Sequence, residues 1–474
     1  MNESDNAKTL LEAQRVAFML EGIVTAEVRI DRLDRAIDML VTHQGEICDA
    51  VAGDFGQRSA TLTRFMDVLP AVVALKHARR HLRRWMRPRR RHIALPAGAP
   101  GVRAEVVHQP LGVVGVISPW NFPVTLSIGP LAGILAAGNR CLIKPSELTP
   151  AVSECMRRLV GQYFDAREVA VVTGGTEVAE AFSRLPFDHL LFTGSASVGR
   201  RVMAAAAANL VPVTLELGGK SPALVGRSAD LRAAVDRIML GKLANAGQMC
   251  IAPDHVCLPR ELLDGFVQLA RSWVDRTYPG LASNPDYTSM VSNHQAERMR
   301  ALLADAAAKG ARVVPLSAQH EAGTAPSRLI FPALILDVTI DMRVMQEEIF
   351  GPLLPVLPYD RIEEPIADIN SRPAPLALYY FGRDRAELRR VLALTTSGGV
   401  TVNDIAMHFL AEELPFGGVG ASGMGAYHGE QGFNRFSHAR AVFHQTRLDV
   451  AGLIGLRPPY GARAKRALSL LIRR

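Results

Sequence analysis

The strongest constraint on the fold is a regular alternation of β-branched runs and amphipathic segments between residues 112 and 217. Strands and helices that alternate at this spacing are typical of βαβ units, which build a doubly wound parallel sheet. Such a sheet binds ligands beyond the carboxyl ends of its strands, so we expect functional residues directly after strands. The alternation predicts strands at 112–117, 140–144, 169–173, 189–193 and 211–217, with helices at 126–138, 150–164, 177–185 and 197–209.

The flanking regions add helices and a second α/β region. A chain of 474 residues is long enough for roughly two or three domains. Apolar residues at spacings of three and four predict helices over 10–23 and 31–55. The second region begins near Gly218, with predicted helices at 231–247 and 261–276, strands at 328–338 and 376–382, and a glycine-rich stretch at 415–429.

The net charge of +8 is concentrated in two segments. Residues 76–91 carry nine Lys and Arg, residues 457–474 carry six more, and neither segment contains an acidic residue. Without these fifteen cations, the rest of the chain has 39 Lys and Arg against 46 Asp and Glu, so its net charge is negative. A nucleic-acid groove needs cations along one face with aromatic rings for stacking, and these segments hold only Trp85 and Tyr460. We therefore expect no nucleic-acid partner.

The cysteines indicate the compartment. There are five of them, an odd number, and no two form a CxxC pair. This argues against a disulfide framework and against a zinc site, so we predict no metal and a reducing, cytoplasmic compartment. The polar N-terminus lacks the apolar core of a signal peptide. Between Glu105 and Arg140 no Asp, Glu, Lys or Arg occurs, but four prolines interrupt this segment, so we predict a buried strand and helix rather than a membrane span.

Three polar residues are candidates for a catalytic role, although each could instead have a purely structural one. Cys250 closes the sequence NAGQMC, yet a single cysteine is more often a small buried apolar residue. Glu216 ends a predicted strand before a Gly-Gly turn, where burial would raise the pKa of its carboxyl and suit a general base. Its alternative is a solvent-facing acid, and Asn121 is more often a turn residue. The stretch GSASVG at 194–199 begins a helix and offers N–H groups to an anion, but this pattern alone is weak.

Six motifs occur together in an order that resembles the aldehyde dehydrogenases. The resemblance runs from residue 54 to residue 442, and six linked motifs make chance agreement negligible. The ending PFGGVGASGMGAYHG is most similar to the class 3 branch, and QPLGVVGVISPWNFP to the coniferyl aldehyde dehydrogenases within it. The motifs are PWNFP at 119–123, KPSE at 144–147, FTGSASVG at 192–199, LELGGKSP at 215–222, NAGQMC at 245–250 and EEIFGP at 347–352.

The resemblance implies a role for each of the three polar residues. Cys250 would be the nucleophile that adds to the aldehyde carbon, giving a thiohemiacetal and, after hydride transfer, a thioester. Asn121 and the backbone N–H of Cys250 would hold the developing oxyanion, and one such donor is typically worth about 3–4 kcal/mol. Glu216 would activate the water that hydrolyses the thioester. Met249 would border the aldehyde pocket.

The resemblance also implies a nicotinamide cofactor. A carboxylate at Glu147 accepts the ribose hydroxyls and repels a 2′-phosphate, so we prefer NAD, while the class 3 resemblance leaves NADP open. Lys144 and Glu147 would meet the adenosine ribose, Gly194 and Ser195 the phosphates, and Glu348 and Phe350 the nicotinamide ribose. Ser118, Trp120, Ser146, Val198 and Leu217 complete the predicted cofactor site.

The implied architecture has a Rossmann-type cofactor domain, an α/β catalytic domain and a small bridging β arm. The arm implies a homodimer. The basic tail is predicted to form a helix with an apolar stripe of Ala464, Leu468, Leu471 and Ile472, suited to an anionic membrane surface or a partner subunit. The predicted domains are 1–91 and 111–218 with a returning piece at about 417–436 (cofactor), 219–416 (catalytic), 92–110 and 437–450 (arm) and 451–474 (tail).

Other activities stay open at this stage. A CoA-acylating dehydrogenase would pass the acyl group to CoA instead of water, although such relatives commonly lack the glutamate found at position 216. A cysteine hydrolase would use Cys250 and Glu216 without redox chemistry, and a non-catalytic protein would need neither. The class 3 resemblance favours an aromatic aldehyde such as coniferyl aldehyde, or a medium- to long-chain aliphatic aldehyde, as the small-molecule substrate.

Overall fold

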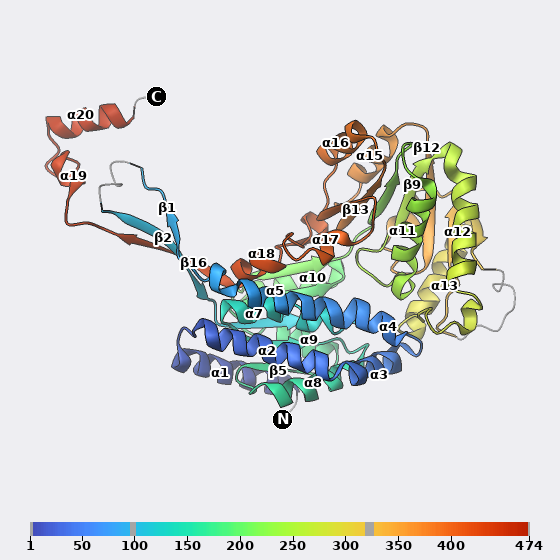
Figure 1. Cartoon of the computed structure of the whole chain (residues 1–474), viewed down its shortest axis with the longest axis horizontal. Coiled ribbons are helices and arrows are strands. Elements are labelled where there is room, and N and C mark those ends of the chain that lie inside the picture. Colours follow the sequence, from blue (N-terminus) through green and yellow to red (C-terminus); the bar gives the residue numbers. More distant parts are fainter. Residues whose placement is uncertain (1–2, 95–100, 318–326, 473–474) are drawn as a thin grey trace.

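The computed structural model describes residues 3–94, 101–317 and 327–472. Figure 1 shows a body made of two α/β parts, from which a thin β arm and a helical tail project. Three sheets organise the chain, one of six strands, one of seven and one of three. The predicted α/β fold class is confirmed, and the domain boundaries stay a prediction.

The six-stranded sheet has the order β15-β7-β6-β3-β4-β5. All its neighbouring strands are parallel except β15, which pairs antiparallel with β7. The chain moves outward from β3 to β5 and then returns to the other side of β3 at β6, so its two halves diverge between β3 and β6. The strands are β3 (Val113–Ile117), β4 (Arg140–Lys144), β5 (Val169–Val171), β6 (His189–Gly194), β7 (Val213–Leu217) and β15 (Gly423–Met424).

Helices cover both faces of this sheet, because successive strand residues point to opposite sides. Val114 and Val116 of β3 belong to the core beneath one helical layer, and Val113 and Ile117 to the core beneath the other. The doubly wound arrangement predicted from the alternation is therefore present. The first layer contains α2 (Ala26–Thr42), α3 (Gln44–Phe55), α5 (Leu69–Trp85), α7 (Leu131–Ala137) and α8 (Pro150–Tyr163), and the second α1 (Glu3–Glu21), α9 (Thr176–Ser183) and α10 (Ala196–Ala207).

The seven-stranded sheet has the order β10-β11-β12-β9-β8-β13-β14 and is parallel except for β10. Helices α11 to α13 share a core with one face, and α15 and α16 with the other. Its strands are β8 (Pro222–Val225), β9 (His255–Pro259), β10 (Arg312–Pro315), β11 (Ala333–Leu336), β12 (Leu353–Tyr359), β13 (Ala377–Phe381) and β14 (Gly399–Val402). Its helices are α11 (Leu231–Leu243), α12 (Leu263–Thr277), α13 (Asn293–Ala308), α14 (Arg343–Gln346), α15 (Glu363–Ser371), α16 (Arg385–Leu394) and α17 (Met407–Leu410).

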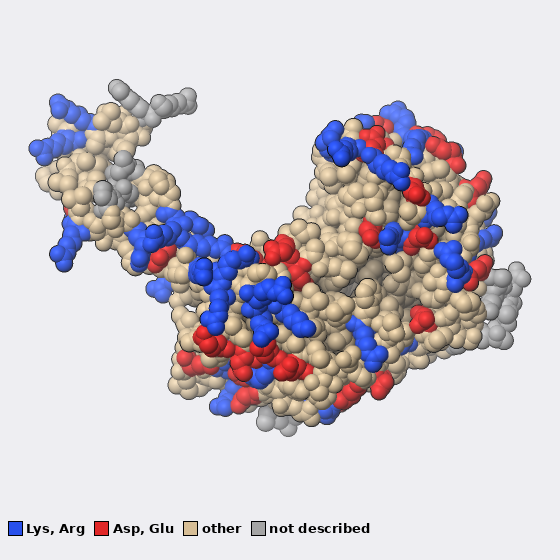
Figure 2. All heavy atoms as spheres, viewed as in Figure 1, with Lys and Arg blue, Asp and Glu red and all other residues tan. Residues whose placement is uncertain are grey.

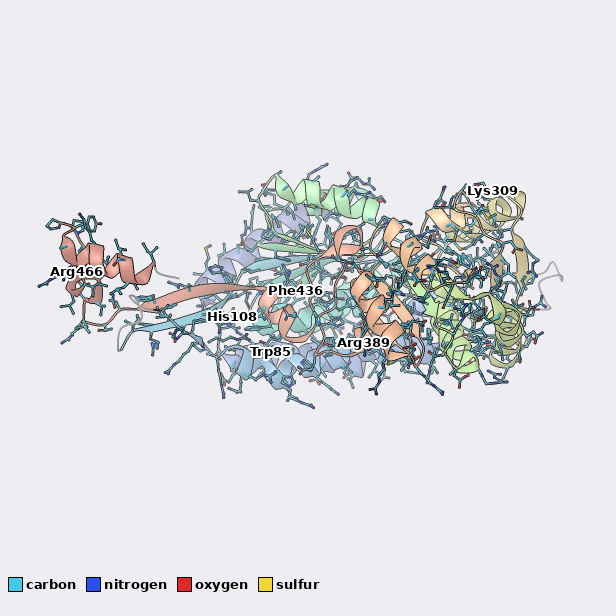
Figure 3. All side chains as sticks on the ribbon, turned by 90° about the horizontal axis from the view of Figure 1, so that it is seen from above. Trp85, His108, Lys309, Arg389, Phe436 and Arg466 are labelled. Carbon is cyan, nitrogen blue, oxygen red and sulfur yellow. The ribbon has the colours of Figure 1, made fainter. Side chains whose placement is uncertain are left out.

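The arm is an antiparallel sheet of β1 (Arg89–Arg91), β2 (Arg103–Pro110) and β16 (Ser437–His444). At its base α18 (Gly429–Arg435) places the ring of Phe433 5.7 Å from Trp85 and 5.3 Å from His108, and Figure 3 shows Trp85, His108 and Phe436 gathered there. The sheet begins at Arg89, before the predicted start at residue 92, because these arginines pair with β2. Residues 95–100 of the predicted arm lie outside the described residues.

Several predicted elements are shorter than the sequence suggested. The helix predicted over 31–55 is broken at His43, which separates α2 from α3. The helix predicted over 126–138 consists of α6 (Thr125–Ile128) and α7, because Pro130 lacks the N–H that would continue one helix. The strand predicted over 328–338 is reduced to β11, which begins directly after Pro332.

The tail consists of α19 (Val450–Leu453) and α20 (Ala462–Leu471), and Arg466 lies far from the body in Figure 3. Within the predicted apolar stripe Ala464 is buried, whereas Leu468 and Ile472 are exposed by 43% and 77%, and the contact that the stripe makes stays a prediction. Figure 2 shows Lys and Arg gathered along α5, the arm and the tail. Within the described residues no helix is long and apolar enough to cross a membrane, and the charge-free segment forms β3, α6 and α7 as a buried strand and helices.

Candidate active site

A first cleft of about 590 Å³ opens beyond the carboxyl ends of β3, β4 and β6. These strands flank the point where the two halves of the sheet diverge, which is where a doubly wound sheet binds its ligand. The structure brings seven predicted cofactor residues together here, namely Ser118, Lys144, Ser146, Glu147, Gly194, Ser195 and Val198.

The chemistry of this cleft fits the phosphates and ribose of a dinucleotide. Ser195 is the N-cap of α10, and its Oγ accepts a hydrogen bond of 3.4 Å from the N–H of Val198. The N–H groups at a helix N-terminus favour a phosphate. On the other side Lys144 is buried, its Nζ donates to the carbonyl of Pro145 at 2.7 Å, and burial lowers the pKa of its ammonium. The cleft therefore offers a helix N-terminus, a cation and the exposed carboxylate of Glu147.

A second cleft of about 540 Å³ continues from the first, because the two share Pro119, Thr193, Gly194 and Ser195. The three predicted catalytic residues and three further predicted cofactor residues line it together, namely Cys250, Glu216, Asn121, Trp120, Glu348 and Phe350.

Leu217 is the one predicted cofactor residue that lines neither cleft. Its side chain is buried under α10, where a Cβ on Gly199 would lie 2.7 Å from the Cδ2 of Leu217. The alternation along β7 explains this placement, since Glu216 points toward the cleft and its neighbour must point the opposite way.

The loop that carries Cys250 has an unusual backbone. Asn245, Ala246 and Gly247 have φ angles of 50°, 51° and 74°, and non-glycine residues rarely adopt this region. A Cβ on Gly247 would lie 2.3 Å from the carbonyl oxygen of Gly351, so only glycine fits there. Such strain clusters at functional sites, where the surrounding structure fixes one geometry.

Gln248 fixes this loop from inside. Its Nε2 donates to the carbonyls of Asn245 and Ser289 at 3.0 and 3.1 Å, and its Oε1 accepts the N–H of Val291 at 2.9 Å. Gln248 thus links the loop that carries Cys250 to the segment of Ser289 and Val291.

Asn121 is fixed by groups on two other segments, the loop that carries Cys250 and the segment of Arg58. Its Nδ2 donates to the carbonyl of Gln248 at 3.2 Å, which leaves its second amide hydrogen available to the cleft. Its backbone carbonyl accepts hydrogen bonds from Arg58 Nη1 at 2.8 Å and Asn245 Nδ2 at 3.1 Å. The amide therefore faces the nucleophile loop in a fixed orientation, as an oxyanion donor requires.

Glu216 presents a buried carboxylate without a partner. The side chain is 3% exposed, and neither Oε1 nor Oε2 has a hydrogen-bond partner among the described residues. Burial raises the pKa of this carboxyl well above its usual value, against a smaller opposing effect from Arg435. Buried acceptors are normally satisfied, so these two oxygens are available to a bound group or a water.

The surroundings of Cys250 favour the thiol over the thiolate. Burial raises the pKa of its thiol to about 12, and the charges of Glu348 and Glu216 add to this effect. The backbone N–H groups of Cys250 and Ile251 act in the opposite direction. Because the thiolate is the nucleophile, the thiol needs a base to react, and Glu216 lines the same cleft.

Glu348 and Phe350 lie opposite Trp120 in the second cleft. Burial raises the pKa of Glu348 to about 8, with Asp254 raising it further and the N–H of Gly219 lowering it. Phe350 has a φ of 51° and packs edge-on against Trp120, with ring centroids 5.3 Å apart. A carboxylate beside two aromatic rings fits a ribose and the flat ring attached to it.

A narrow apolar pocket meets this cleft at Cys250. It holds about 80 Å³, and Met249 is part of its wall. Most of the remaining wall is apolar and consists of Phe65, Met66, Pro70, Phe122, Phe409 and Leu410. Cys250 therefore stands between a polar cleft and an apolar pocket.

Sequence reasoning missed several residues of the site. Arg58 and Asp67 support the turn of Asn121, while Gln295 and Arg298 line the second cleft. Arg58 lies in DFGQRS at 54–59, where the resemblance begins, but none of the four lies in one of the six motifs or directly after a strand. The side chains of His77, His81 and Glu413 meet on the surface, outside both clefts, and the absence of a metal site stays a prediction.

Comparison with known proteins agrees with this geometry. Residues 2–442 match the family model described as "Aldehyde dehydrogenase family". The chain is 52% identical to a probable coniferyl aldehyde dehydrogenase of Caulobacter vibrioides over 97% of its own length and 95% of that protein. It is 49% identical to a coniferyl aldehyde dehydrogenase of a Pseudomonas species over 98% and 95% of the two chains.

Solved structures give the same result. The substrate-bound state of Staphylococcus aureus AldH has a TM-score of 0.90 at 35% identity, covering 98% of this chain and 99% of that one. An aldehyde dehydrogenase of Mycobacterium tuberculosis complexed with NAD+ has a TM-score of 0.84 at 27% identity, covering 94% and 91%. The predictions of an enzyme and of its family are confirmed, since the chain belongs to the aldehyde dehydrogenase family.

Proposed function

We propose that this protein oxidises an apolar aldehyde to the carboxylic acid, with NAD as hydride acceptor and Cys250 as nucleophile. The observation that carries the proposal is the position of Cys250, which lines both the cofactor-side cleft and the apolar pocket. An aldehyde carbon at its Sγ would have the cofactor on one side and its own apolar chain on the other. One aldehyde, one NAD+ and one water give one acid, one NADH and one proton.

In the first step Glu216 accepts the proton of the Cys250 thiol. The sulfur attacks the aldehyde carbon, and the carbonyl oxygen becomes an oxyanion. Asn121 Nδ2 and the backbone N–H of Cys250 donate to this oxyanion. When bound, the cofactor supplies a hydride acceptor for the resulting thiohemiacetal, which becomes a thioester on Cys250.

In the second step Glu216, having released the first proton, accepts a proton from water. The water oxygen attacks the thioester carbon, the carbon–sulfur bond breaks, and Cys250 leaves as a thiolate. The raised pKa of Glu216 suits both transfers, because it makes this carboxylate a stronger proton acceptor than an exposed glutamate.

The first cleft supports NAD and leaves room for NADP. Glu147 offers a carboxylate to the ribose hydroxyls and would repel a 2′-phosphate. Arg184 and Arg201 line the same cleft and could compensate that charge. We therefore expect a higher kcat/KM with NAD and measurable turnover with NADP.

The apolar pocket supports an aromatic aldehyde as substrate. Three phenylalanines, Phe65, Phe122 and Phe409, line it together with Met249. Aromatic rings and a polarisable thioether pack well against a planar aromatic substrate. Coniferyl aldehyde is accordingly the first compound to test, followed by medium- and long-chain aliphatic aldehydes.

The decisive experiment follows the absorbance of reduced cofactor with aromatic and aliphatic aldehydes, with NAD and NADP in parallel. Cys250→Ala is the matched control and should remove all turnover. Absence of turnover with every aldehyde would overturn the proposal. The same reactions run with CoA separate the two dehydrogenase types, since a free acid as the sole product supports Glu216-activated water and an acyl-CoA product contradicts it.

The arm supports a homodimer. β16 forms an open edge of the three-stranded sheet, and Phe443 on this strand is 51% exposed. We propose that the arm pairs with a second copy, which light scattering would test directly.

Peripheral membrane contact through the tail is a separate proposal. It is supported by the cations of the tail and by the exposed side chains of Leu470 and Ile472. Removal of residues 460–474 followed by liposome co-sedimentation tests it. The five free cysteines support a cytoplasmic site of action.

A further inference from the structure

Three side chains with metal-binding atoms meet on the surface, and none of them lines the clefts or the pocket described above. His77 and His81 come from α5, and Glu413 follows α17. One ring nitrogen of each histidine and one carboxylate oxygen of Glu413 lie within 4.8 Å of one another. Among the described residues no other three His, Cys, Asp or Glu side chains meet in this way.

The two histidines are arranged as a ligand pair. Their spacing of four residues places both on one face of α5, with ring centroids 4.2 Å apart. His81 Nδ1 lies 3.0 Å from the carbonyl oxygen of His77, which can only accept, so Nδ1 carries the proton and Nε2 keeps a lone pair. Metal-bound histidines usually donate their second N–H to a carbonyl in this way.

Packing limits the rotation of both rings. Trp85 is fully buried, its ring is stacked on His81 at 5.9 Å, and it lies 5.8 Å from the ring of His77. The third group is adjustable, since Glu413 is 70% exposed and its Oε1 is 3.7 Å from His77 Nε2. Bond lengths of about 2.0 Å place the ligands of a tetrahedral ion about 3.3 Å apart. The three ligand atoms, which lie within 4.8 Å of one another, must therefore approach by at most about 1.5 Å to share an ion.

We propose that His77, His81 and Glu413 bind a Zn²⁺ ion, with water as the fourth ligand. Two imidazole nitrogens select a transition metal over Mg²⁺ or Ca²⁺, which prefer oxygen ligands. The ion would tie α5 to the segment after α17. Pro70 of α5 and Phe409 and Leu410 of α17 are walls of the apolar pocket, so the tie joins two sides of the aldehyde site.

The charges around the cluster agree with binding of moderate strength. Arg80 and Arg84 act electrostatically on His77, as does Glu413. The two arginines also oppose a dication, whereas the Glu413 carboxylate favours one.

The test is a Zn²⁺ titration of full-length Cys250→Ala protein after treatment with a chelator, measured by competition with a chromophoric chelator. This background removes the catalytic thiol as a competing ligand. Because the experiment measures Zn²⁺ binding and not turnover, its result does not depend on the proposed function. We expect one Zn²⁺ per chain, with a d–d spectrum of bound Co²⁺ that lacks a thiolate charge-transfer band.

Added variants decide whether these residues are the ligands. His77→Ala or His81→Ala should lower the Zn²⁺ affinity at least a hundredfold, and Glu413→Gln about tenfold. His438→Ala removes an exposed histidine from β16 and should leave the affinity unchanged. Zn²⁺ should also raise the Tm of the Cys250→Ala protein but not of its His81→Ala derivative. No saturable binding, or binding that survives His81→Ala unchanged, would overturn the proposal.

Discussion

The guanidinium of Arg58 donates a hydrogen bond of 2.8 Å to the backbone carbonyl of Asn121, the residue expected to hold the oxyanion. The same guanidinium pairs with Asp67 at 3.3 Å, and both side chains are completely buried. Asp67 Oδ1 in turn accepts the N–H groups of Val124 and Thr125 at 3.0 and 2.7 Å. A buried ion pair therefore holds the turn of Asn121 on both sides, and fixed geometry is what an oxyanion donor needs.

Arg58→Ala should impair both stability and catalysis. It leaves Asp67 as an uncompensated buried charge, which typically costs about 3–5 kcal/mol of unfolding free energy. A displaced Asn121 amide should lower kcat about 10- to 100-fold, with little change in the KM for NAD. Arg58→Lys should recover part of kcat because its ammonium still reaches one acceptor. Urea unfolding and kcat per folded molecule check this, and a variant that loses stability alone would show that Arg58 does not position Asn121.

Glu216→Gln should slow both chemical steps. The amide can accept neither the proton of the Cys250 thiol nor a proton from water, so thioester formation and thioester hydrolysis both lose their base. We expect kcat to fall about 100- to 10,000-fold, with no burst of NADH ahead of steady turnover in stopped-flow absorbance. Glu12→Gln, at an exposed position of α1, is the control and should behave as wild type. Steady turnover of the Glu216 variant at the wild-type rate would exclude this residue as the base.

Cofactor binding should strengthen as pH rises through about 8, the value to which burial raises the pKa of Glu348. The ionised carboxylate accepts two ribose hydroxyls, whereas the protonated form retains fewer acceptor sites. The KM for NAD should therefore fall between pH 7 and 9 in the wild type. In Glu348→Gln it should be higher and independent of pH over this interval. A wild-type KM that does not vary with pH would contradict the role of this carboxylate.

Gly247→Ala should distort the nucleophile loop. The residue has a φ of 74°, and its new Cβ would lie 2.3 Å from the carbonyl oxygen of Gly351. A non-glycine residue in this region typically costs about 1–3 kcal/mol, to which the clash adds. We expect a lower urea midpoint and slower alkylation of Cys250 by iodoacetamide. Gly161→Ala on α8 is the control, since a Cβ added there would meet nothing within 4 Å and the helix should gain stability.

Local pattern was enough to identify the sheet and the residues at its edge. The five strands from β3 to β7 lie where β-branched runs predicted them, because burial on both faces demands continuous apolar runs. The carboxyl ends of β7, β6 and β4 carry Glu216, Gly194 and Lys144. A doubly wound sheet binds its ligand beyond these ends, and the three residues accordingly line the clefts. Leu217 shows the limit of this reasoning, since one step along a strand turns a side chain to the opposite face.

The sequence by itself determined the α/β class, the parallel strands and the polar groups able to perform the chemistry, because these depend on periodicity and on residue type. Only the tertiary structure decided what surrounds them. It placed Arg58 and Asp67 under Asn121, brought Glu413 to His77 and His81, and closed an apolar pocket on Cys250. Each of these contacts joins segments that are distant along the chain, and no local pattern records which loops meet after the two sheets have packed.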